Sequence, residues 1–231
     1  THEIMNSITP VASLAKTAVD LVEDVQEKTQ SLPSISAEIS EELEDVLGAV
    51  KTVARRSDGL MQFVTSYRQL TRLPAANKKI MSVTTLFTHV ATLAKQNWQK
   101  NDIELSYNIV PQALDVNVDP DMIEQILLNL LLNAAHAVTQ VTTPKITLQA
   151  FLNVRGHVVI EVTDNGHGIA NMDNIFVPFY TTKKQGQGIG LSLSKNIIEQ
   201  HGGRLTLVNN VDKQGATAKI YLSQKGAVHF S

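Results

Sequence analysis

A long helical repeat of apolar residues dominates the first third of the chain and restricts how this part can fold. Before the breaker SLPSIS, apolar or small residues alternate in steps of four and three at Ile4, Ile8, Val11, Ala15, Ala18, Val22 and Val25. After the breaker the same spacing resumes at Ile39, Leu43, Val46, Val50, Val53, Leu60, Val64 and Tyr67. Ser57 occupies one position of this apolar seam. Two such segments joined by a short turn predict an antiparallel helical hairpin.

One hairpin cannot bury both of its apolar stripes, because additional apolar side chains widen them: Leu14, Leu21, Leu47 and Phe63. Two copies that form a four-helix bundle would bury these side chains. We therefore expect a homodimer through the hairpin. The acidic run EISEELED is interpreted as the solvated face of the second helix.

The composition argues against several function classes. Twenty Lys and Arg residues against 22 Asp and Glu residues give a net charge of −2, which provides no electrostatic footprint for nucleic acid. The absence of cysteine excludes disulfides and thiolate chemistry. The longest apolar stretch, ILLNLLLNAAHAV, is short and contains asparagines, so we expect no membrane segment in this chain. Because the chain begins at Thr1, we expect an upstream sensor or membrane region and a cytoplasmic location for this part.

The pattern changes after the linker RLPAANKK, and a length of 231 residues favours two domains. We expect the first over residues 1–73 and the second over residues 80–231. The second contains predicted helices at about 82–100, about 120–139 and GLSLSKNIIEQ, and predicted strands IELSYNIV, LDVNVD, KITLQAFLNV, HVVIEVTD, RLTLVNN and TAKIYLS. Asp119 and Pro120 provide a cap and a first-turn residue for the middle helix. This irregular order predicts the α+β class: one mixed sheet covered by helices.

Two asparagines stand four residues apart on the predicted helix at 120–139 and so share one face. Asn129 and Asn133 interrupt a helix whose opposite face consists of Ile and Leu, where amides without partners are costly. An amide oxygen is a suitable ligand for Mg²⁺. The alternative is that both amides are exposed or bond to neighbouring backbone, and the pair alone does not decide between the two interpretations.

Two glycine-rich segments add features of a nucleotide site. DNGHGI follows a predicted strand, and Asp164 could accept a hydrogen bond from an exocyclic amine such as that of adenine, although the same pattern also fits a hairpin turn. KKQGQGIGLSLS leads into a predicted helix, whose N-terminus favours anions, but it lacks the ending of a P-loop. Ahead of it, a polar stretch is flanked by predicted apolar anchors, as in a lid over a ligand: Phe176, Pro178 and Phe179.

The order of these motifs resembles one ATPase superfamily. An asparagine-bearing helix, Asp-x-Gly-x-Gly, Phe-x-Pro-Phe, Gly-x-Gly-x-Gly and a late GAT follow one another within about 90 residues. Residues 80–223 thereby resemble the GHKL-type ATP-binding domain shared by sensor histidine kinases, gyrase B subunits, MutL-type ATPases and heat-shock chaperones. The resemblance implies ATP and Mg²⁺ as cofactors, with Asn133 as the Mg²⁺ ligand and Asn129 beside it.

The same resemblance implies roles at the adenine end of the site. Asp164 would accept a hydrogen bond from the adenine amino group, while Gly166 and Gly168 would shape the adenine pocket. Thr217 is also carried over as a nucleotide-binding residue. Ala216 stands where many relatives have threonine, and this departure weakens the transfer of a role to the GAT segment.

At the phosphate end, the resemblance implies that Lys183 reaches a phosphate. The phosphates themselves would be held by Gly186, Gly188, Gly190 and the amide of Leu191. His136 occupies a position that is often basic in relatives, and its role is left open.

The opening HEIMNSITP resembles the phosphoacceptor motif of histidine kinases: a histidine, an acidic residue, two spacers, an asparagine and a later proline. The resemblance implies that His2 takes the γ-phosphoryl group of ATP while Glu3 accepts its Nδ1 proton, and that an aspartate of a response-regulator receiver domain then receives the phosphoryl group. Asn6 would orient water for phosphatase activity toward that receiver. Pro10 would loosen the helix and favour a switch between the two activities. The segments FVTSYRQLTRLP and PFYTTKKQGQGIGLSL look closest to nitrogen-regulation-type sensor kinases.

Two alternatives are carried forward from the sequence. A GHKL-superfamily ATPase would use hydrolysis to drive a conformational clamp, and the predicted hairpin argues against it. A dimeric scaffold would bind nucleotide without histidine phosphorylation, and the intact asparagine, aspartate and glycine positions argue against that.

Overall fold

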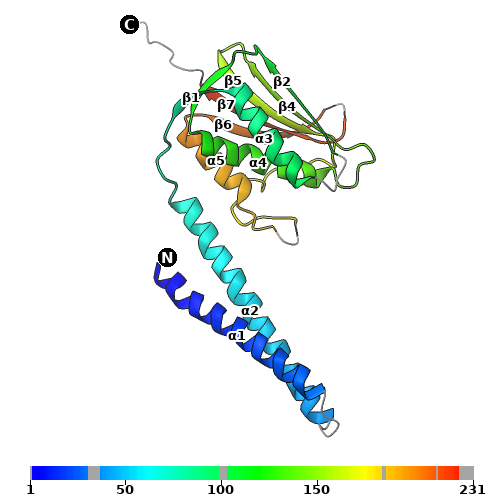
Figure 1. The fold of residues 1–231 in the computed structure, drawn as a ribbon. Coiled ribbons are helices and arrows are strands. Elements are labelled where there is room, and N and C mark those ends of the chain that lie inside the picture. Colours follow the sequence, from blue (N-terminus) through cyan, green and yellow to red (C-terminus); the bar gives the residue numbers. More distant parts are fainter. Residues whose placement is uncertain (1, 31–36, 99–102, 184–185, 212, 224–231) are drawn as a thin grey trace. The chain divides into compact units, whose positions relative to one another are not determined.

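A computed structural model describes the chain apart from residues 1, 31–36, 99–102, 184–185, 212 and 224–231 (Figure 1). The chain divides into two compact units, Thr1–Arg72 and Leu73–Ser231. In the part of the chain that the structure describes, no helix is long and apolar enough to cross a membrane.

The first unit is a helical hairpin of α1 (His2–Gln30) and α2 (Ala37–Thr71). Its interface contains small and branched side chains, with Ala15, Leu47 and Val64 all at most 9% exposed. A salt bridge of 2.7 Å between Lys51 Nζ and Glu23 Oε1 also joins the two helices. The predicted antiparallel hairpin is therefore confirmed.

Much of the predicted apolar seam is not covered within this hairpin. Six predicted seam residues and three flanking ones are 46–70% exposed: Val11, Leu14, Leu21, Val25, Val46, Val53, Leu60, Phe63 and Tyr67. By contrast, Leu47, predicted to flank the seam, is buried. A single partner helix covers only a narrow stripe, so the remaining apolar side chains stay accessible.

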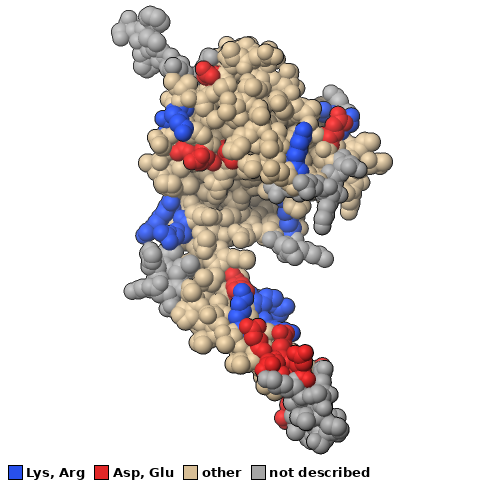
Figure 2. Space-filling model, viewed as in Figure 1, with Lys and Arg blue, Asp and Glu red and all other residues tan. Residues whose placement is uncertain are grey.

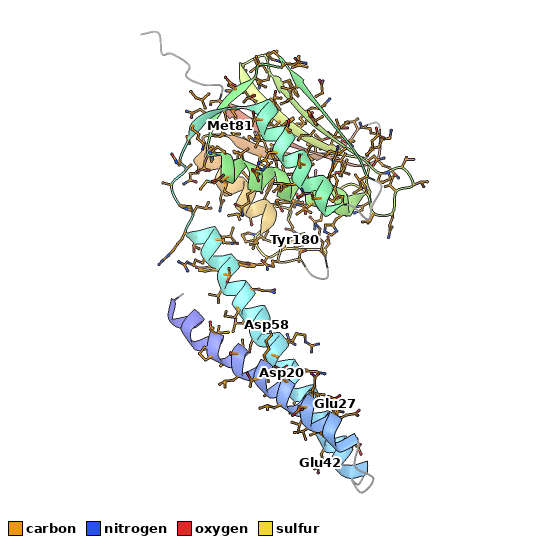
Figure 3. The ribbon with its side chains drawn as sticks, viewed as in Figure 1. Asp20, Glu27, Glu42, Asp58, Met81 and Tyr180 are labelled. Carbon is orange, nitrogen blue, oxygen red and sulfur yellow. The ribbon has the colours of Figure 1, made fainter. Side chains whose placement is uncertain are left out.

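Acidic side chains gather on the hairpin, where Figure 3 labels Asp20, Glu27 and Glu42, and Figure 2 shows them in red. The described acidic residues of EISEELED are exposed: Glu41, Glu42, Glu44 and Asp45. Their interpretation as a solvated helix face is confirmed.

The second unit is built on a mixed five-stranded sheet with the order β2-β4-β5-β7-β6. The strands span Glu104–Val110 (β2), Lys145–Leu152 (β4), His157–Asp164 (β5), Arg204–Asn209 (β6) and Ala216–Ser223 (β7). β2 runs parallel to β4, and the other neighbouring strands are antiparallel. A separate pair joins β1 (Lys79–Ser82) to β3 (Asp115–Val118), and β1 falls in and after the segment predicted to be a linker.

Three helices cover the sheet: α3 (Val83–Asn97), α4 (Pro120–Ala137) and α5 (Gly190–Gln200) (Figure 1). The core between helices and sheet contains large side chains less than 2% exposed, among them Phe87, Ile126, Leu127, Leu148 and Ile160. The predicted α+β sandwich with a mixed sheet and a helical layer is confirmed.

The start of α4 is tied to the end of α5. Asp119 caps α4 as predicted, because its Oδ1 accepts a hydrogen bond of 3.2 Å from Met122 N. The backbone N–H of Asp119 also donates to Nε2 of the buried His201, at 3.0 Å. His201 Nδ1 lies 2.7 Å from Ile197 O, so Nδ1 carries the proton and Nε2 accepts. This ring fixes the two helices that carry the polar side chains of the candidate site.

Candidate functional site

Asn129 lies at the contact between α4 and α5. Its Nδ2 donates a hydrogen bond of 3.0 Å to Ser194 Oγ on α5. A Cβ atom on Gly190 would lie only 2.4 Å from Asn129 Oδ1. Close packing of the two helices therefore favours glycine at position 190. Asn129 is half-buried and bonds to a side chain of another helix, so it is neither exposed nor bonded to neighbouring backbone, as the alternative interpretation expected.

Asn133 lies one turn further along α4, and its amide oxygen faces a cation. Asn133 Oδ1 accepts a hydrogen bond of 2.6 Å from Lys183 Nζ. Partial desolvation of the Lys183 ammonium lowers its pKa below the ordinary value. Burial, and then the charge of Lys183, also lower the pKa of His136. The structure thus brings together three residues that the sequence separates by as many as 50 positions.

The amide oxygen of Asn133 is a suitable ligand for a divalent cation, and it already accepts a hydrogen bond from the Lys183 ammonium group. Among the described residues, no group of three or more His, Asp or Glu side chains could hold a metal ion. A Mg²⁺ ion at Asn133 would therefore take its other oxygen ligands from nucleotide phosphates and water, as Mg²⁺ commonly does.

Asp164 ends β5 and is 8% exposed. Its Oδ1 accepts hydrogen bonds from Gly166 N at 2.8 Å and from Ala216 N at 3.3 Å. Desolvation raises the pKa of this carboxyl group, and the two backbone hydrogen bonds oppose part of that rise. Among the described residues Oδ2 accepts no hydrogen bond, so it can accept one from a ligand amine.

The loop after Asp164 packs on the C-terminal end of α4. A Cβ atom on Gly166 would lie 2.4 Å from Ala137 O, which also accepts a hydrogen bond from His167 N at 3.3 Å. Gly168 has a φ of +75°, a backbone conformation that favours glycine. Because Ala137 follows Asn133 by one helical turn, α4 connects the Asp164 loop to the Asn133–Lys183 pair.

Lys183 is carried by the loop between β5 and α5, where Figure 3 labels Tyr180. The base of this loop is closed by a hydrogen bond of 2.8 Å from Phe179 N to Gly188 O. Gly188 has a φ of +68°, and its Cβ would lie 2.5 Å from the carbonyl carbon of Phe179. Closer to the tip, Thr181 Oγ1 accepts a hydrogen bond from Lys183 N at 3.1 Å, and a Cβ on Gly186 would lie 2.6 Å from the same oxygen.

The prediction of three apolar anchors around this loop is wrong for two of them. Phe176 is half-buried, and Lys195 Nζ lies 5.3 Å from the centre of its ring. Pro178 and Phe179 are exposed, Phe179 by 38%. A backbone hydrogen bond from Phe179 N to Gly188 O closes the base of the loop.

Within the described residues, the N-terminus of α5 has no side-chain cap. Its N-cap residue is Ile189, which contributes no side-chain hydrogen bond. In the described part of the chain, no side chain accepts a hydrogen bond from the N–H of Gly190 or Leu191. Backbone N–H groups at a helix start favour anions, which suits the phosphate-binding role predicted for this segment.

Thr217 is buried, and among the described residues its hydroxyl makes no hydrogen bond to the Asp164 carboxylate. Its hydroxyl donates to Asn210 Oδ1 at 2.7 Å, and Asn210 Nδ2 in turn donates to the backbone oxygen of Asp164 at 3.0 Å. The sequence reasoning missed Asn210 and its neighbour Asn209. The available signal was the pair of asparagines that ends the strand RLTLVNN, close to the GAT segment.

The predicted phosphoacceptor residues lie at the start of α1. The helix begins at His2 and includes Glu3 and Asn6, but the side chains of these three residues lie outside the described part of the structure. The helix continues through Pro10, which is exposed.

Comparisons with known proteins find a family match within the second unit. Residues 118–226 match the family described as histidine kinase-, DNA gyrase B-, and HSP90-like ATPase. The sensor histidine kinase ZraS of Salmonella typhi is 33% identical over 96% of this chain and 43% of its own length. The sensory histidine kinase/phosphatase NtrB of Vibrio alginolyticus is 26% identical over 88% of this chain and 55% of its own length. The chain thus spans roughly half, or less, of the curated relatives it matches.

Solved structures agree at the level of the fold. The match to the catalytic domain of the histidine kinase ThkA covers 64% of this chain and 96% of the ThkA chain, with 28% identity and a TM-score of 0.57. The match to full-length ShkA, solved in complex with AMPPNP, covers 98% of this chain and 45% of the ShkA chain, with 21% identity and a TM-score of 0.63. The second of these likenesses concerns the fold alone.

Proposed function

We propose that this chain is an ATP-dependent protein-histidine kinase that phosphorylates itself on His2. The proposal is supported by its similarity to sensor histidine kinases and by the ATPase family that matches residues 118–226. One observation carries the proposal. The helix α4 connects two groups. One is the buried carboxylate of Asp164, which suits an exocyclic amine, and the other is the amide oxygen of Asn133, which faces the Lys183 ammonium. This arrangement suits a ligand with a purine at one end and phosphates at the other.

At the purine end, Asp164 accepts a hydrogen bond from the exocyclic amine through Oδ2, because Oδ1 is engaged by two backbone N–H groups. Gly166 and Gly168 leave room for a flat ring near the backbone. Ionisation of Asp164 costs more than for an exposed carboxyl group, since desolvation raises its pKa. A hydrogen bond from an amine offsets part of that cost.

At the phosphate end, Asn133, Lys183 and the N-terminus of α5 hold the triphosphate. Lys183 leaves the amide of Asn133 and pairs with a phosphate oxygen, which is a stronger acceptor. Mg²⁺, when bound, would neutralise charge on the phosphates. The amides of Gly190 and Leu191 add hydrogen-bond donors along the helix axis.

The transfer itself joins His2 Nε2 to the γ-phosphorus and breaks the bond from that phosphorus to the β–γ bridging oxygen, so that ADP leaves. The imidazole must be neutral to attack, because a protonated ring nitrogen has no lone pair to offer. Glu3 accepts the Nδ1 proton and thereby assists the attack. In-line positioning of the two reactants supplies most of the remaining assistance.

We further propose a response-regulator receiver domain as the partner. Its aspartate takes the phosphoryl group from His2. In the separate phosphatase activity, Asn6 orients a water that attacks the phosphorus of the phospho-aspartate, so that inorganic phosphate leaves and the carboxylate is restored. An Asn6→Ala variant should keep the transfer to the receiver and lose most of the dephosphorylation. Equal dephosphorylation rates for the variant and the unmodified protein would remove this role from Asn6.

The proposed kinase works as a homodimer through the hairpin. Nine large apolar side chains of α1 and α2 are 46–70% exposed in one copy of the chain. Single exposed apolar residues are ordinary, but a stripe of them along two helices indicates a partner surface. A second copy would bury both stripes in a four-helix bundle.

The decisive experiment is phosphorylation with ATP labelled in the γ-phosphoryl group. The protein is incubated with this ATP and Mg²⁺, and the labelled residue is mapped by mass spectrometry under alkaline conditions that preserve phosphohistidine. His2→Gln should abolish the label. The matched control, His89→Gln, changes an exposed histidine of α3 and should leave the label intact. Label on another residue, or binding of ATP without any label, would refute the proposal.

A further inference from the structure

Two neighbouring asparagines at the end of β6 hold the loop from Asp164 to Ile169. Asn209 Oδ1 accepts a hydrogen bond of 2.7 Å from Ile169 N, and Asn209 Nδ2 donates one of 2.9 Å to Ile169 O. One side-chain amide therefore pairs with both backbone groups of a single residue. A small rotation of the loop at Ile169 would lengthen at least one of these hydrogen bonds.

Asn210 holds the other end of the same loop. Its Nδ2 donates to Asp164 O at 3.0 Å and to Gln214 O at 3.2 Å, and its Oδ1 accepts from Thr217 Oγ1 at 2.7 Å. Thr217 has a single hydroxyl proton, which is used in this bond. Thr163 must therefore donate in the 2.9 Å hydrogen bond between the two threonine hydroxyls. The chain of hydrogen bonds runs from the sheet through Asn210 to the backbone of Asp164.

Two glycines allow the turn between β6 and β7 to lie directly against the loop. Gly215 has a φ of +109°, and a Cβ atom there would lie 2.0 Å from Asp164 O. A Cβ atom on Gly168 would lie 3.0 Å from Asn209 Oδ1. The loop is thus supported at its first and last residues by side chains from a different hairpin.

We infer that Asn209 and Asn210 are positioning residues for the purine. They hold Asp164 and the glycines after it in the shape that accepts the base, without touching the nucleotide themselves. A loop held in this way loses little conformational freedom when the ligand binds, so affinity rises without new contacts. The inference rests on the proposed function, because it takes the Asp164 loop to be the purine pocket.

Asn209→Ala is the direct test, because Asn209 is exposed and its loss leaves no buried polar side chain without a partner. Calorimetry compares adenosine, which engages only the purine pocket, with inorganic tripolyphosphate and Mg²⁺, which engage only the phosphate end. Two lost hydrogen bonds predict adenosine binding weaker by about tenfold. Binding of tripolyphosphate should stay unchanged. In the phosphorylation assay, KM for ATP should rise by a similar factor while kcat changes little.

Two further variants make the test specific. Asn108→Ala changes an exposed asparagine of β2 and should leave adenosine binding unaltered. Asn209→Gln keeps the amide but displaces it by one methylene group, so it should weaken adenosine binding to a similar extent even if the alanine variant folds poorly.

The outcomes separate this inference from the proposed function. Equal adenosine binding by the unmodified protein and Asn209→Ala would overturn the inference alone. A parallel loss of adenosine and tripolyphosphate binding would also overturn it, since that indicates general unfolding of the unit. Adenosine binding that depends on Asn209, together with an unlabelled His2, would support the inference and overturn the proposed kinase activity. An unmodified protein that binds neither ATP nor adenosine would overturn both.

Discussion

A single methyl group at position 190 should destabilise the second unit, and the reason lies in the contact between α4 and α5. In Gly190→Ala the new carbon would stand 2.4 Å from Asn129 Oδ1 and 3.0 Å from both Cγ and Nδ2. Ordinary carbon contacts lie near ~3.5 Å, so Asn129 or the start of α5 must move by about 1 Å. That movement would break the 3.0 Å hydrogen bond from Asn129 Nδ2 to Ser194 Oγ.

The magnitude follows from three contributions. Loss of the hydrogen bond costs about 1 kcal/mol. Overpacking costs about 1–3 kcal/mol. Alanine in a helix recovers up to about 1 kcal/mol relative to glycine. The free energy of unfolding of the second unit should therefore fall by about 1–3 kcal/mol.

The assay is urea unfolding, with Gly48→Ala as the matched control. Gly48 is an exposed glycine of α2 where an added Cβ would meet no atom within 4 Å, so alanine should stabilise that helix by about 0.5–1 kcal/mol. The only tryptophan, Trp98, is buried in the second unit, so its fluorescence follows the unit that contains Gly190. Circular dichroism follows the helices of both units, so a transition that Trp98 fluorescence does not show reports the first unit. A Gly190→Ala protein as stable as the unmodified one, or more stable, would refute the packing argument.

Three further predictions concern other parts of the molecule. Asp119→Ala should lower the free energy of unfolding by about 1 kcal/mol near neutral pH, because the α4 cap is lost. Hydrogen bonds, first that from Asn77, hold the pKa of Asp119 below 3.8. The stability difference should therefore persist above pH 3.8 and disappear as the pH falls through the lowered pKa, which urea titrations at several pH values would check. Lys183→Met should weaken ATP binding by about tenfold, most at low salt, and leave adenosine binding unchanged; calorimetry measures both, and equal ATP affinities would remove the phosphate role from Lys183. Leu14→Glu places a charge on a side chain that is 70% exposed in the single hairpin and should shift the protein toward monomer in analytical ultracentrifugation, whereas an unaltered dimer would exclude this stripe as the interface.

Much of the fold could be predicted because each element carries its own local signal. The helix α4 shows apolar periodicity and a cap formed by Asp119 and Pro120, and both features act within a few residues. The strand β1 was not predicted, because it carries no such local signal. It has four residues, and it is stabilised by pairing with β3, in which Lys79 faces Val118. A strand this short has too few residues to display an alternating pattern of its own.

The candidate site was predictable as a set of residues and less so as a set of contacts. Glycines were recognised from their spacing, but the structure gives Gly166 and Gly190 packing roles against Ala137 and Asn129. Similarly, Phe179 looked like an apolar anchor, whereas its backbone rather than its side chain closes the loop. Which atoms touch depends on how separate elements pack, and a pattern along the chain does not contain that information.

The amino-acid sequence by itself determined the helical hairpin, the α+β class and the choice of chemical groups available for a nucleotide, because periodicity, capping and residue chemistry are local properties. Only the tertiary structure decided that Lys183 meets Asn133 and that Asn209 and Asn210 support the Asp164 loop. These pairs lie 40 to 50 residues apart. Their contacts arise because the sheet and α4 bring distant segments to one place, and hydrogen bonds of less than about 3.5 Å form only after that packing is complete.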